Sequence, residues 1–322
     1  MDPQASVVIA THNRRDRILR TLDALAGQVG APPFEVIVVD DGSTDGTHAA
    51  LTARTGDPYP LRAIRQEPNR GPAAARNAGW RAATAGVVCF TDDDCTPDPG
   101  WLAALTAASD HADISQGRTI PDPGQAGNRG PFSRTMTVPF EEGFYETCNI
   151  AYHRGLLERL GGFDESFRYP YGEDTDLAWR GREAGASTTF VDAAIVRHDV
   201  WPSDYRAQLR DMRRREGLIL MYHKHPQLRR HFGRKLFFRD IHPATLGWTS
   251  CLIVLAVRPR SPARWTAALA GGLWYAWMCR RARPNPPRRW QWMVVVPLAF
   301  VADAYEMAVM ARASVKYRTL LL

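Results

Sequence analysis

The chain has 322 residues, of which 45% are hydrophobic and 23% charged. This composition indicates a globular protein and excludes disordered, collagen-like and coiled-coil chains. The length exceeds one typical domain, so we expect a sizeable core and an appended region. Residues 201–322 hold 22 Lys or Arg against 6 Asp or Glu, whereas residues 1–200 hold 19 against 28. An acidic front and a basic back suggest two different roles.

The five cysteines form no C-x-x-C pair, and their number is odd. This pattern predicts neither a disulfide framework nor a zinc knuckle, and it favours a reducing compartment. The first residues show no basic region followed by an apolar run. We therefore expect no signal peptide, and we expect the active part to stay in the cytoplasm.

The first ninety residues alternate short β-branched apolar runs with helical patterns. Strands are predicted over residues 5–11, 34–40, 61–65 and 87–91, and helices over residues 15–29 and 72–85. In the first helix, Ile18, Leu22, Leu25 and Val29 recur at spacings of three and four, which predicts one buried face. Strands alternating with helices in this way indicate an α/β fold with a mostly parallel sheet flanked by helices.

The second hundred residues continue this pattern after an interruption. Residues 110–139 are rich in Gly and Pro and predict a long, functional or mobile loop. A strand is expected near 147–153, followed by one helix from Arg154 and another that opens near Glu173. Two short apolar runs, 188–191 and 194–196, precede His198.

The last third is helical, basic and apolar by turns. Residues 202–232 show a basic helical pattern, and three apolar stretches follow at 245–257, 265–279 and 290–311. The first two are shorter than the ~20 residues that a membrane span needs, and the third contains Pro297, Asp303 and Glu306. With tryptophans and arginines beside them, the stretches favour interfacial or re-entrant membrane helices, the alternative being a soluble helical subdomain. We thus expect a domain at 1–200, a basic helical segment at 201–243 and a membrane-associating region at 244–322.

Acidic residues follow two of the predicted strands. Asp92, Asp93 and Asp94 come directly after the strand VVCFT, and a strand ending in Asp40 runs into Asp41. Adjacent carboxylates repel one another, and a divalent cation such as Mg²⁺ or Mn²⁺ removes that cost. In an open α/β sheet, ligands bind beyond the carboxyl ends of the strands, where these acids fall. A solvated acidic turn that caps a helix is the alternative.

The segments SVVIATHNRR, VIVVDDGSTDGT, NRGPAAARNAGWRAATAG and VVCFTDDDCTPDPGWL, in this order, resemble the family-2 glycosyltransferases of the GT-A fold. The later segment ETCNIAYHRGLLERLGGFDESFRYPYGEDTDLAWRGREAG looks like the acceptor-side and catalytic-base region of that family. The resemblance covers about residues 5–200 and leaves out the C-terminal third. It implies a metal-dependent inverting transfer of a sugar from a nucleoside-diphosphate donor to a hydroxyl acceptor.

The resemblance also implies roles for single residues. It implies that the nucleotide-sugar donor is held by Thr11, Asn13, Asp41, Arg76, Asp92 and Asp93. It implies that Mn²⁺ or Mg²⁺ is held by Asp94, with His198 as an additional ligand, although a histidine satisfied at a strand end is equally consistent. Because three aspartates are adjacent, Asp93 could take either the donor role or the metal role.

On the acceptor side, Asp174 matches the position of the catalytic base. The start of a helix there is expected to lower the pKa of Asp174, so that it is ionised at pH 7. Glu173 either hydrogen-bonds the acceptor or caps the helix, and Gly162 lies where the acceptor wall is expected.

The expected partners follow from the two halves. We expect a nucleoside-diphosphate sugar, a lipid-linked or cell-envelope glycan as acceptor, and a membrane surface bound through residues 244–322 at its cytoplasmic face. A polyprenyl-phosphate acceptor is one alternative, and a non-catalytic, membrane-tethered nucleotide-sugar-binding module is another. Nucleic acid is not an expected partner, because the basic residues alternate with apolar runs instead of forming a groove reader.

Overall fold

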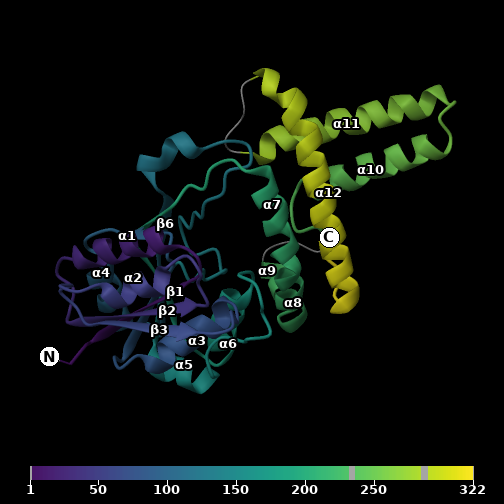
Figure 1. Ribbon diagram of the computed structural model, residues 1–322. Coiled ribbons are helices and arrows are strands. Elements are labelled where there is room, and N and C mark those ends of the chain that lie inside the picture. The colour runs from purple at the N-terminus through teal and green to yellow at the C-terminus, as the bar shows by residue number, and fades with distance from the viewer. Residues whose placement is uncertain (1, 232–235, 284–288, 322) are drawn as a thin grey trace. The chain divides into compact units, whose positions relative to one another are not determined.

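The computed structural model describes residues 2–231, 236–283 and 289–321 (Figure 1). The chain divides into two compact units. The first, here called the sheet unit, comprises Met1–Ala126 and Thr135–Val200. The second, here called the helical unit, comprises Gly127–Arg134 and Trp201–Leu322.

The sheet unit is built on a mixed sheet of eight strands in the described residues. The strands are β1 (Ala5–Thr11), β2 (Phe34–Asp41), β3 (Leu61–Gln66), β4 (Val87–Thr91), β5 (Cys95–Pro97), β6 (Ile114–Pro121), β7 (Asn149–His153) and β8 (Thr188–His198). Their order is β3-β2-β1-β4-β7-β6-β8-β5. The first four are parallel, as is the pair β6 and β8, whereas β7 runs antiparallel to β4 and β6, and β5 runs antiparallel to β8.

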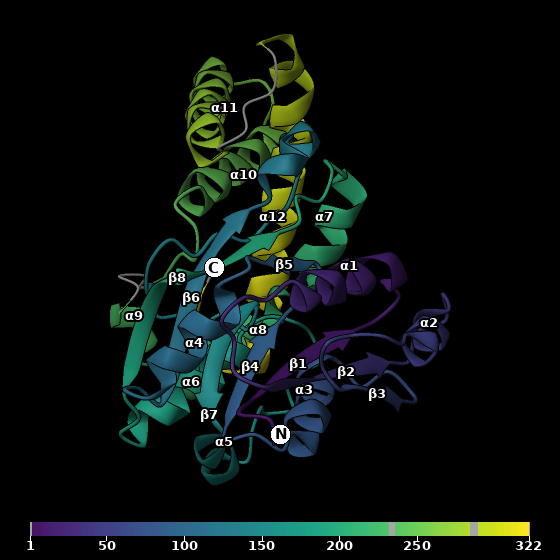
Figure 2. The ribbon, with the colours of Figure 1, turned by 90° about the vertical axis from the view of Figure 1, so that its left-hand side faces the viewer.

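Helices cover both faces of this sheet (Figure 2). They are α1 (Arg15–Ala26), α2 (Thr47–Ala53), α3 (Pro72–Ala82), α4 (Trp101–Ser109), α5 (Arg154–Leu160) and α6 (Glu173–Glu183), with a 3-10 turn over Pro123–Asn128. Val7 and Ile9 of β1 pack with α1 and α4, and Val8 packs with α3, α5 and α6. Successive strand residues thus feed two cores, which explains the continuous apolar runs in the sequence.

Most of the predicted elements of this unit are present, with three differences. Helix α1 ends at Ala26, so the prediction that Val29 belongs to its buried face is wrong: Val29 is exposed. The segment 110–139, predicted to be a loop, contains strand β6. Its Gly117 and Pro121 made this strand look like a loop in the sequence. The two apolar runs before His198 form the single strand β8, in which a register shift opposite Gly117 interrupts the apolar pattern.

The carboxyl ends of the central strands meet at one edge of the sheet, as predicted. Thr11 at the end of β1 pairs with Asp40 near the end of β2. Strand β4, which neighbours β1, ends at Thr91 and leads directly into the three aspartates. The polar residues that follow these strands are therefore neighbours in space.

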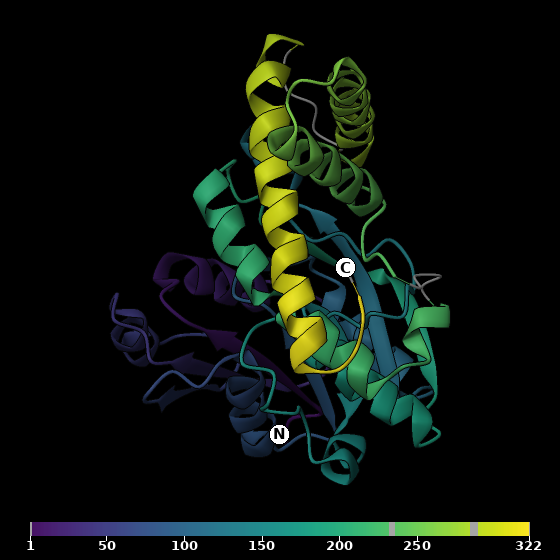
Figure 3. The same cartoon turned by 90° about the vertical axis from the view of Figure 1, so that its right-hand side faces the viewer.

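The helical unit consists of helices that pack on a core of their own (Figure 3). They are α7 (Tyr205–Met212), α8 (Glu216–Lys224), α9 (Leu228–His231), α10 (His242–Val257), α11 (Pro262–Ala282) and α12 (Trp292–Lys316), with 3-10 turns at Arg213–Arg215 and Arg289–Gln291. The core includes Phe132, Ile241, Tyr275, Val295 and Ala299. The three predicted apolar stretches lie on α10, α11 and α12. In the described residues, only Arg289–Lys316 is long and apolar enough to cross a membrane.

Candidate active site

Two of the predicted donor-binding residues organise the loops at the sheet edge. Asn13 has a positive φ of 54°, and its side-chain oxygen accepts a hydrogen bond from the Thr44 amide at 2.7 Å. The carboxylate of Asp41 accepts hydrogen bonds from the amides of Arg70 and Gly71, each at 2.8 Å. Gly71 has a φ of +90°, and a Cβ there would lie 2.7 Å from a backbone carbonyl oxygen, so only glycine fits.

The three adjacent aspartates turn toward different partners. Asp92 is partly exposed and accepts a hydrogen bond from Arg76 at 2.9 Å. Asp93 is buried and accepts a hydrogen bond from the Thr11 hydroxyl at 2.7 Å. Burial raises the pKa of Asp93 to about 6, in spite of the opposing charge of Arg14. Asp94, also buried, lies near His198. Neighbouring cationic and hydroxyl groups thus offset part of the mutual repulsion of the three carboxylates.

Asp94 and His198 form a pair of ligand atoms suited to a divalent cation. The Asp94 Oδ1 and His198 Nε2 atoms lie 3.6 Å apart. The His198 Nδ1 atom lies 2.8 Å from the Asp199 carbonyl oxygen, which places the proton of a neutral imidazole on Nδ1. Nε2 then directs its lone pair at the carboxylate. A cation bound between these two acceptors would remove the repulsion between them.

Cys95 lies in the same group, in which each residue has one ligand atom within 4.8 Å of the others. Burial raises the pKa of the Cys95 thiol well above its ordinary value, so the sulfur stays protonated at neutral pH. A carboxylate and an imidazole without a thiolate suit Mn²⁺ or Mg²⁺ better than a soft metal.

Arg14 contributes a cation that the sequence analysis did not identify. Its guanidinium donates to Asp93 and, at 3.2 Å, to Asp94. The charges of these carboxylates raise the pKa of Arg14 further, although burial opposes this effect. Arg14 lies about eighty positions from its partners in the chain, and the only sequence signal was its place directly after the predicted donor residues.

A second arginine joins the donor side of the site to the acceptor side. Arg76, on α3, is buried and donates to Asp92 and to Glu173, each at 2.9 Å. Glu173 begins α6, and Asp174 follows it. The second carboxylate oxygen of Glu173 is buried without a hydrogen-bond partner in the described part of the chain. A single guanidinium thus connects the aspartate cluster with the segment of the expected base.

The electrostatics of Asp174 differ from the prediction. Its Oδ1 accepts a hydrogen bond from the Thr175 amide at 2.8 Å, but burial outweighs this bond and raises the pKa of Asp174 above its ordinary value. The expectation that the helix start lowers this pKa is wrong, because desolvation of a carboxylate is the larger effect here. A raised pKa makes the carboxylate a better proton acceptor near neutral pH. Burial, reinforced by the Asp174 charge, raises the pKa of Glu173 to about 8.

Glu146 is a further acid near this end of the site that the sequence analysis did not single out. It is partly buried and accepts a hydrogen bond from the Gln116 side chain at 2.8 Å. Burial and the Asp174 charge raise its pKa to about 7. No pattern distinguished Glu146 in sequence, since it lies in an irregular segment between β6 and β7.

Gly162, predicted on the acceptor wall, packs against α3. It has a φ of +78°, and a Cβ there would lie 2.4 Å from side-chain atoms of Asn77 and Trp80. The backbone at Gly162 therefore lies so close to α3 that any side chain at this position would clash with it.

Comparison with known proteins agrees with this arrangement. Residues 6–161 match the sequence profile of glycosyl transferase family 2. Residues 6–161 thus have the sequence of this family. It is 30% identical over 227 residues to a pre-mycofactocin glycosyltransferase of Mycobacterium tuberculosis, which covers 64% of this chain and 44% of that protein. It is also 28% identical over 209 residues to the glycosyltransferase AglE of Haloferax volcanii, covering 62% of this chain and 68% of that one.

The chain therefore spans less than half the length of the first of these relatives. Among solved structures it is similar to residues 1–349 of TarS from S. aureus in complex with UDP, with a TM-score of 0.54 and 21% identity. That similarity covers 98% of this chain and 91% of the TarS chain, and at this level of identity it shows a shared fold.

Proposed function

We propose that this family-2 chain transfers a sugar from a nucleoside-diphosphate donor to a hydroxyl acceptor, with inversion at the anomeric carbon. The observation that carries the proposal is the buried Arg76 bridge between Asp92 and Glu173, which holds the donor carboxylates beside the expected base. The similarity to TarS, whose structures contain UDP and UDP-GlcNAc, supports a nucleotide-sugar donor.

In this proposal the residues divide the work of a direct displacement. Asp174 accepts the proton of the attacking hydroxyl, and its raised pKa suits that role near neutral pH. Asn13 and Asp41 hold the loops in which the base of the donor lies. Arg76 fixes the separation between the two ends of the site, so that acceptor and donor are oriented before they react.

We also assign a divalent cation to the pair formed by Asp94 and His198. Mn²⁺ or Mg²⁺ bound there supplies positive charge for the departing nucleoside diphosphate. The facing lone pairs at 3.6 Å support this assignment. Asp94 and His198 would hold the ion, and the Arg14 guanidinium, 3.2 Å from Oδ2 of Asp94, adds a fixed positive charge beside them.

The acceptor and its location follow from the helical unit. We propose a lipid-linked or cell-envelope glycan as acceptor, used at the cytoplasmic face of a membrane to which residues 244–322 bind. Exposed apolar side chains concentrated on α10 and α11 support this part of the proposal.

The test replaces the expected base. Asp174→Asn should abolish sugar transfer and leave nucleotide affinity near that of the wild type, since the amide cannot take the proton. Asp110→Asn, an exposed position of the same unit, is the matched control and should behave as wild type. Nucleotide affinity is measured by titration calorimetry with UDP, GDP and dTDP, each with and without Mn²⁺. Equal loss of transfer and binding in Asp174→Asn would remove Asp174 from the base role. Failure of all three nucleotides to bind would favour a non-catalytic module.

A further inference from the structure

Helices α10 and α11 form a hairpin whose exposed side chains are mostly apolar. The two helices lie side by side and antiparallel within the helical unit (Figure 1). The sequence contains no Asp, Glu, Lys or Arg over 243–257 or over 265–279. The exposed large apolar side chains of the hairpin are Leu246, Leu252, Ile253, Val254, Val257, Trp265, Leu269, Leu273, Trp274 and Trp277. A surface helix in water has a polar face, so this hairpin requires an apolar environment around it.

The polar groups within the hairpin are satisfied by the hairpin itself. The hydroxyls of Thr249, Ser250 and Thr266 each donate to the backbone carbonyl four residues earlier, at 2.7, 2.9 and 3.1 Å. Gly272 lies against Trp248, where an added Cβ would meet the indole at 3.1 Å. Internally bonded hydroxyls and glycine at a close helix contact are features that helices need inside a bilayer.

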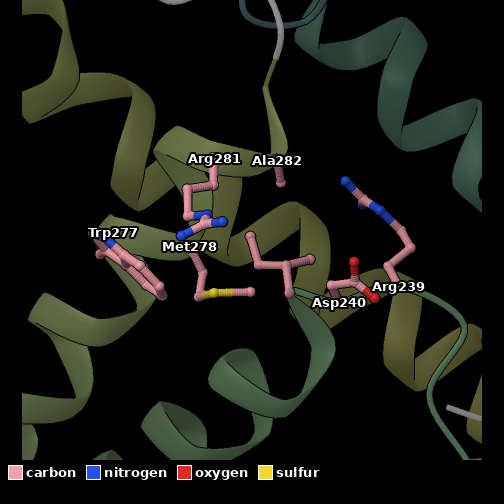
Figure 4. Close-up of a pocket in the computed structure, with 7 residues that line it drawn as sticks. Arg239, Asp240, Trp277, Met278, Arg281 and Ala282 are labelled. Carbon is pink, nitrogen blue, oxygen red and sulfur yellow. The ribbon is translucent and has the colours of Figure 1, made fainter.

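Arginines stand at both ends of the hairpin. They are Arg258, Arg260 and Arg264 at the turn, and Arg280 and Arg281 at the base. Among the residues that the structure describes, none of these five has a carboxylate within ion-pair distance. Arg281 lies over the Trp277 ring at 4.7 Å, beside a cavity of about 630 Å³ (Figure 4). Arginine paired with tryptophan at the ends of an apolar segment is suited to the headgroup layer of an anionic bilayer.

Among the described helices, α12 is long and apolar enough to cross a membrane, but unlike the hairpin it carries acidic residues. Its Asp303 and Glu306 are fully buried. Asp303 accepts a hydrogen bond from the Tyr275 hydroxyl at 2.6 Å, and Arg239 donates to Asp303 at 3.1 Å and to Glu306 at 2.9 Å. Arg215 also pairs with Glu306. Because arginines from other segments pair with both buried carboxylates, α12 is the core helix of the helical unit.

We propose that the α10–α11 hairpin inserts into one leaflet of an anionic lipid bilayer, and that α12 does not enter the hydrocarbon. The exposed apolar segments 246–257 and 265–277 have 12 and 13 residues, or about 18 and 20 Å of helix. The hydrocarbon is about 30 Å thick, so a crossing hairpin would leave the turn arginines inside it. The inference rests on the membrane association proposed above and names the element and the lipid chemistry responsible for it.

The experiment compares matched acidic substitutions on two exposed positions. Leu273→Asp lies on α11, where Leu273 is 64% exposed, and Val301→Asp lies on α12, where Val301 is 56% exposed. Full-length protein is bound to phosphatidylcholine vesicles, with and without 30% phosphatidylglycerol, in 0.1 M NaCl, and is then floated after a wash with 1 M NaCl, which removes purely electrostatic binding. We expect wild type and Val301→Asp to float with the anionic vesicles, and Leu273→Asp to lose at least tenfold in the bound fraction.

Insertion depth is read from Ser261→Cys at the hairpin turn. A membrane-impermeant maleimide is added to intact vesicles carrying the protein on their outside, and the modified peptide is identified by mass spectrometry. We expect modification of the turn to the same extent as in detergent. Modification only after detergent would show that the bilayer shields the turn, within the hydrocarbon or on the far side, and would overturn insertion into one leaflet with the turn arginines at its headgroups.

The remaining outcomes separate the two proposals. Loss of flotation in Val301→Asp with Leu273→Asp unaffected, or no effect of either substitution, would overturn the hairpin inference while leaving membrane association in place. Failure of the wild-type protein to float would overturn both. Nucleotide affinity, titrated on the same samples, should be unchanged in both variants, so that failure of the donor-site proposal is detected independently.

Discussion

Replacing Arg76 by methionine should destabilise the sheet unit far more than the same change at a surface arginine of the same helix. The Arg76 side chain is 7% exposed, and its two partners Glu173 and Asp92 are 2% and 28% exposed. Methionine keeps much of the volume and removes the charge, which leaves Glu173 buried without its cation. Breaking a buried pair by removing one partner costs about 3–5 kcal/mol of unfolding free energy when both partners are charged, which for Glu173 requires a pH above its pKa of about 8.

The matched control is Arg81→Met. Arg81 is 52% exposed, and its nearest carboxylate, in Glu165, is 3.7 Å away. An exposed pair of this kind contributes about 0–1 kcal/mol. Both variants are unfolded in urea and followed by tryptophan fluorescence, with Trp80 and Trp101 reporting from the sheet unit. The expected difference between them is about 2–4 kcal/mol at pH 9, where Glu173 of the wild type is ionised.

The effect of Arg76→Met should also depend on pH in a stated direction. Below the ordinary glutamate pKa, Glu173 is protonated in both folded and unfolded chains, and the loss of its cation costs little. Up to a pKa of about 8 the folded wild type retains this proton as well, so the two proteins lose stability alike. Above that pH Glu173 of the wild type ionises beside Arg76 while that of the variant stays protonated, so the variant loses stability relative to wild type. A loss in Arg76→Met equal to that in Arg81→Met, or one that does not grow between pH 7 and pH 9, would refute this account of the bridge.

Three further predictions concern the same unit. Glu146→Gln should gain stability relative to wild type between pH 5 and pH 8 in thermal melts, because the raised pKa of Glu146 makes its ionisation oppose folding as the pH rises; a constant difference would contradict the burial argument. Chelation by EDTA should stop transfer and Mn²⁺ should restore it, and His198→Ala should weaken Mn²⁺ binding, followed by electron paramagnetic resonance, by about tenfold or more; unaltered binding would exclude the imidazole as a ligand. Gly71→Ala should weaken UDP, GDP or dTDP binding in calorimetry, because an added Cβ displaces the backbone that holds Asp41; Gly86→Ala, where a Cβ meets nothing within 4 Å, is its control.

The sequence was informative where an element is buried along its whole length. Apolar runs predicted β1, β2 and β4 because these strands are buried on both faces, and polar residues after them predicted where their ends meet. Strand β6 was not predicted, because its Gly117 and Pro121 are residue types that are also common in loops.

The partners of the site residues depended on contacts between distant segments. Arg14 and Arg76 neutralise carboxylates that lie far along the chain, and no local pattern marks such pairs. The pKa of Asp174 was predicted in the wrong direction, because local sequence shows the helix start but not the depth of burial. Three apolar stretches were recognised as helices and the acids of the third were noted, but only the packed structure shows that arginines from other segments pair with those acids.

The Arg76 bridge has a consequence for how the acceptor range of such a fold can diversify. Because one guanidinium ties the end of β4 to the start of α6, the spacing between the proposed donor site and the proposed base would be set within the rigid frame of the sheet. The irregular chain between β6 and β7 contributes no residue to that bridge. On the proposed function, substitutions and insertions in that segment would alter which hydroxyl is admitted and leave the bridge in place. Inheritance of the chemistry and drift of the substrate would then rest on separate segments of the chain.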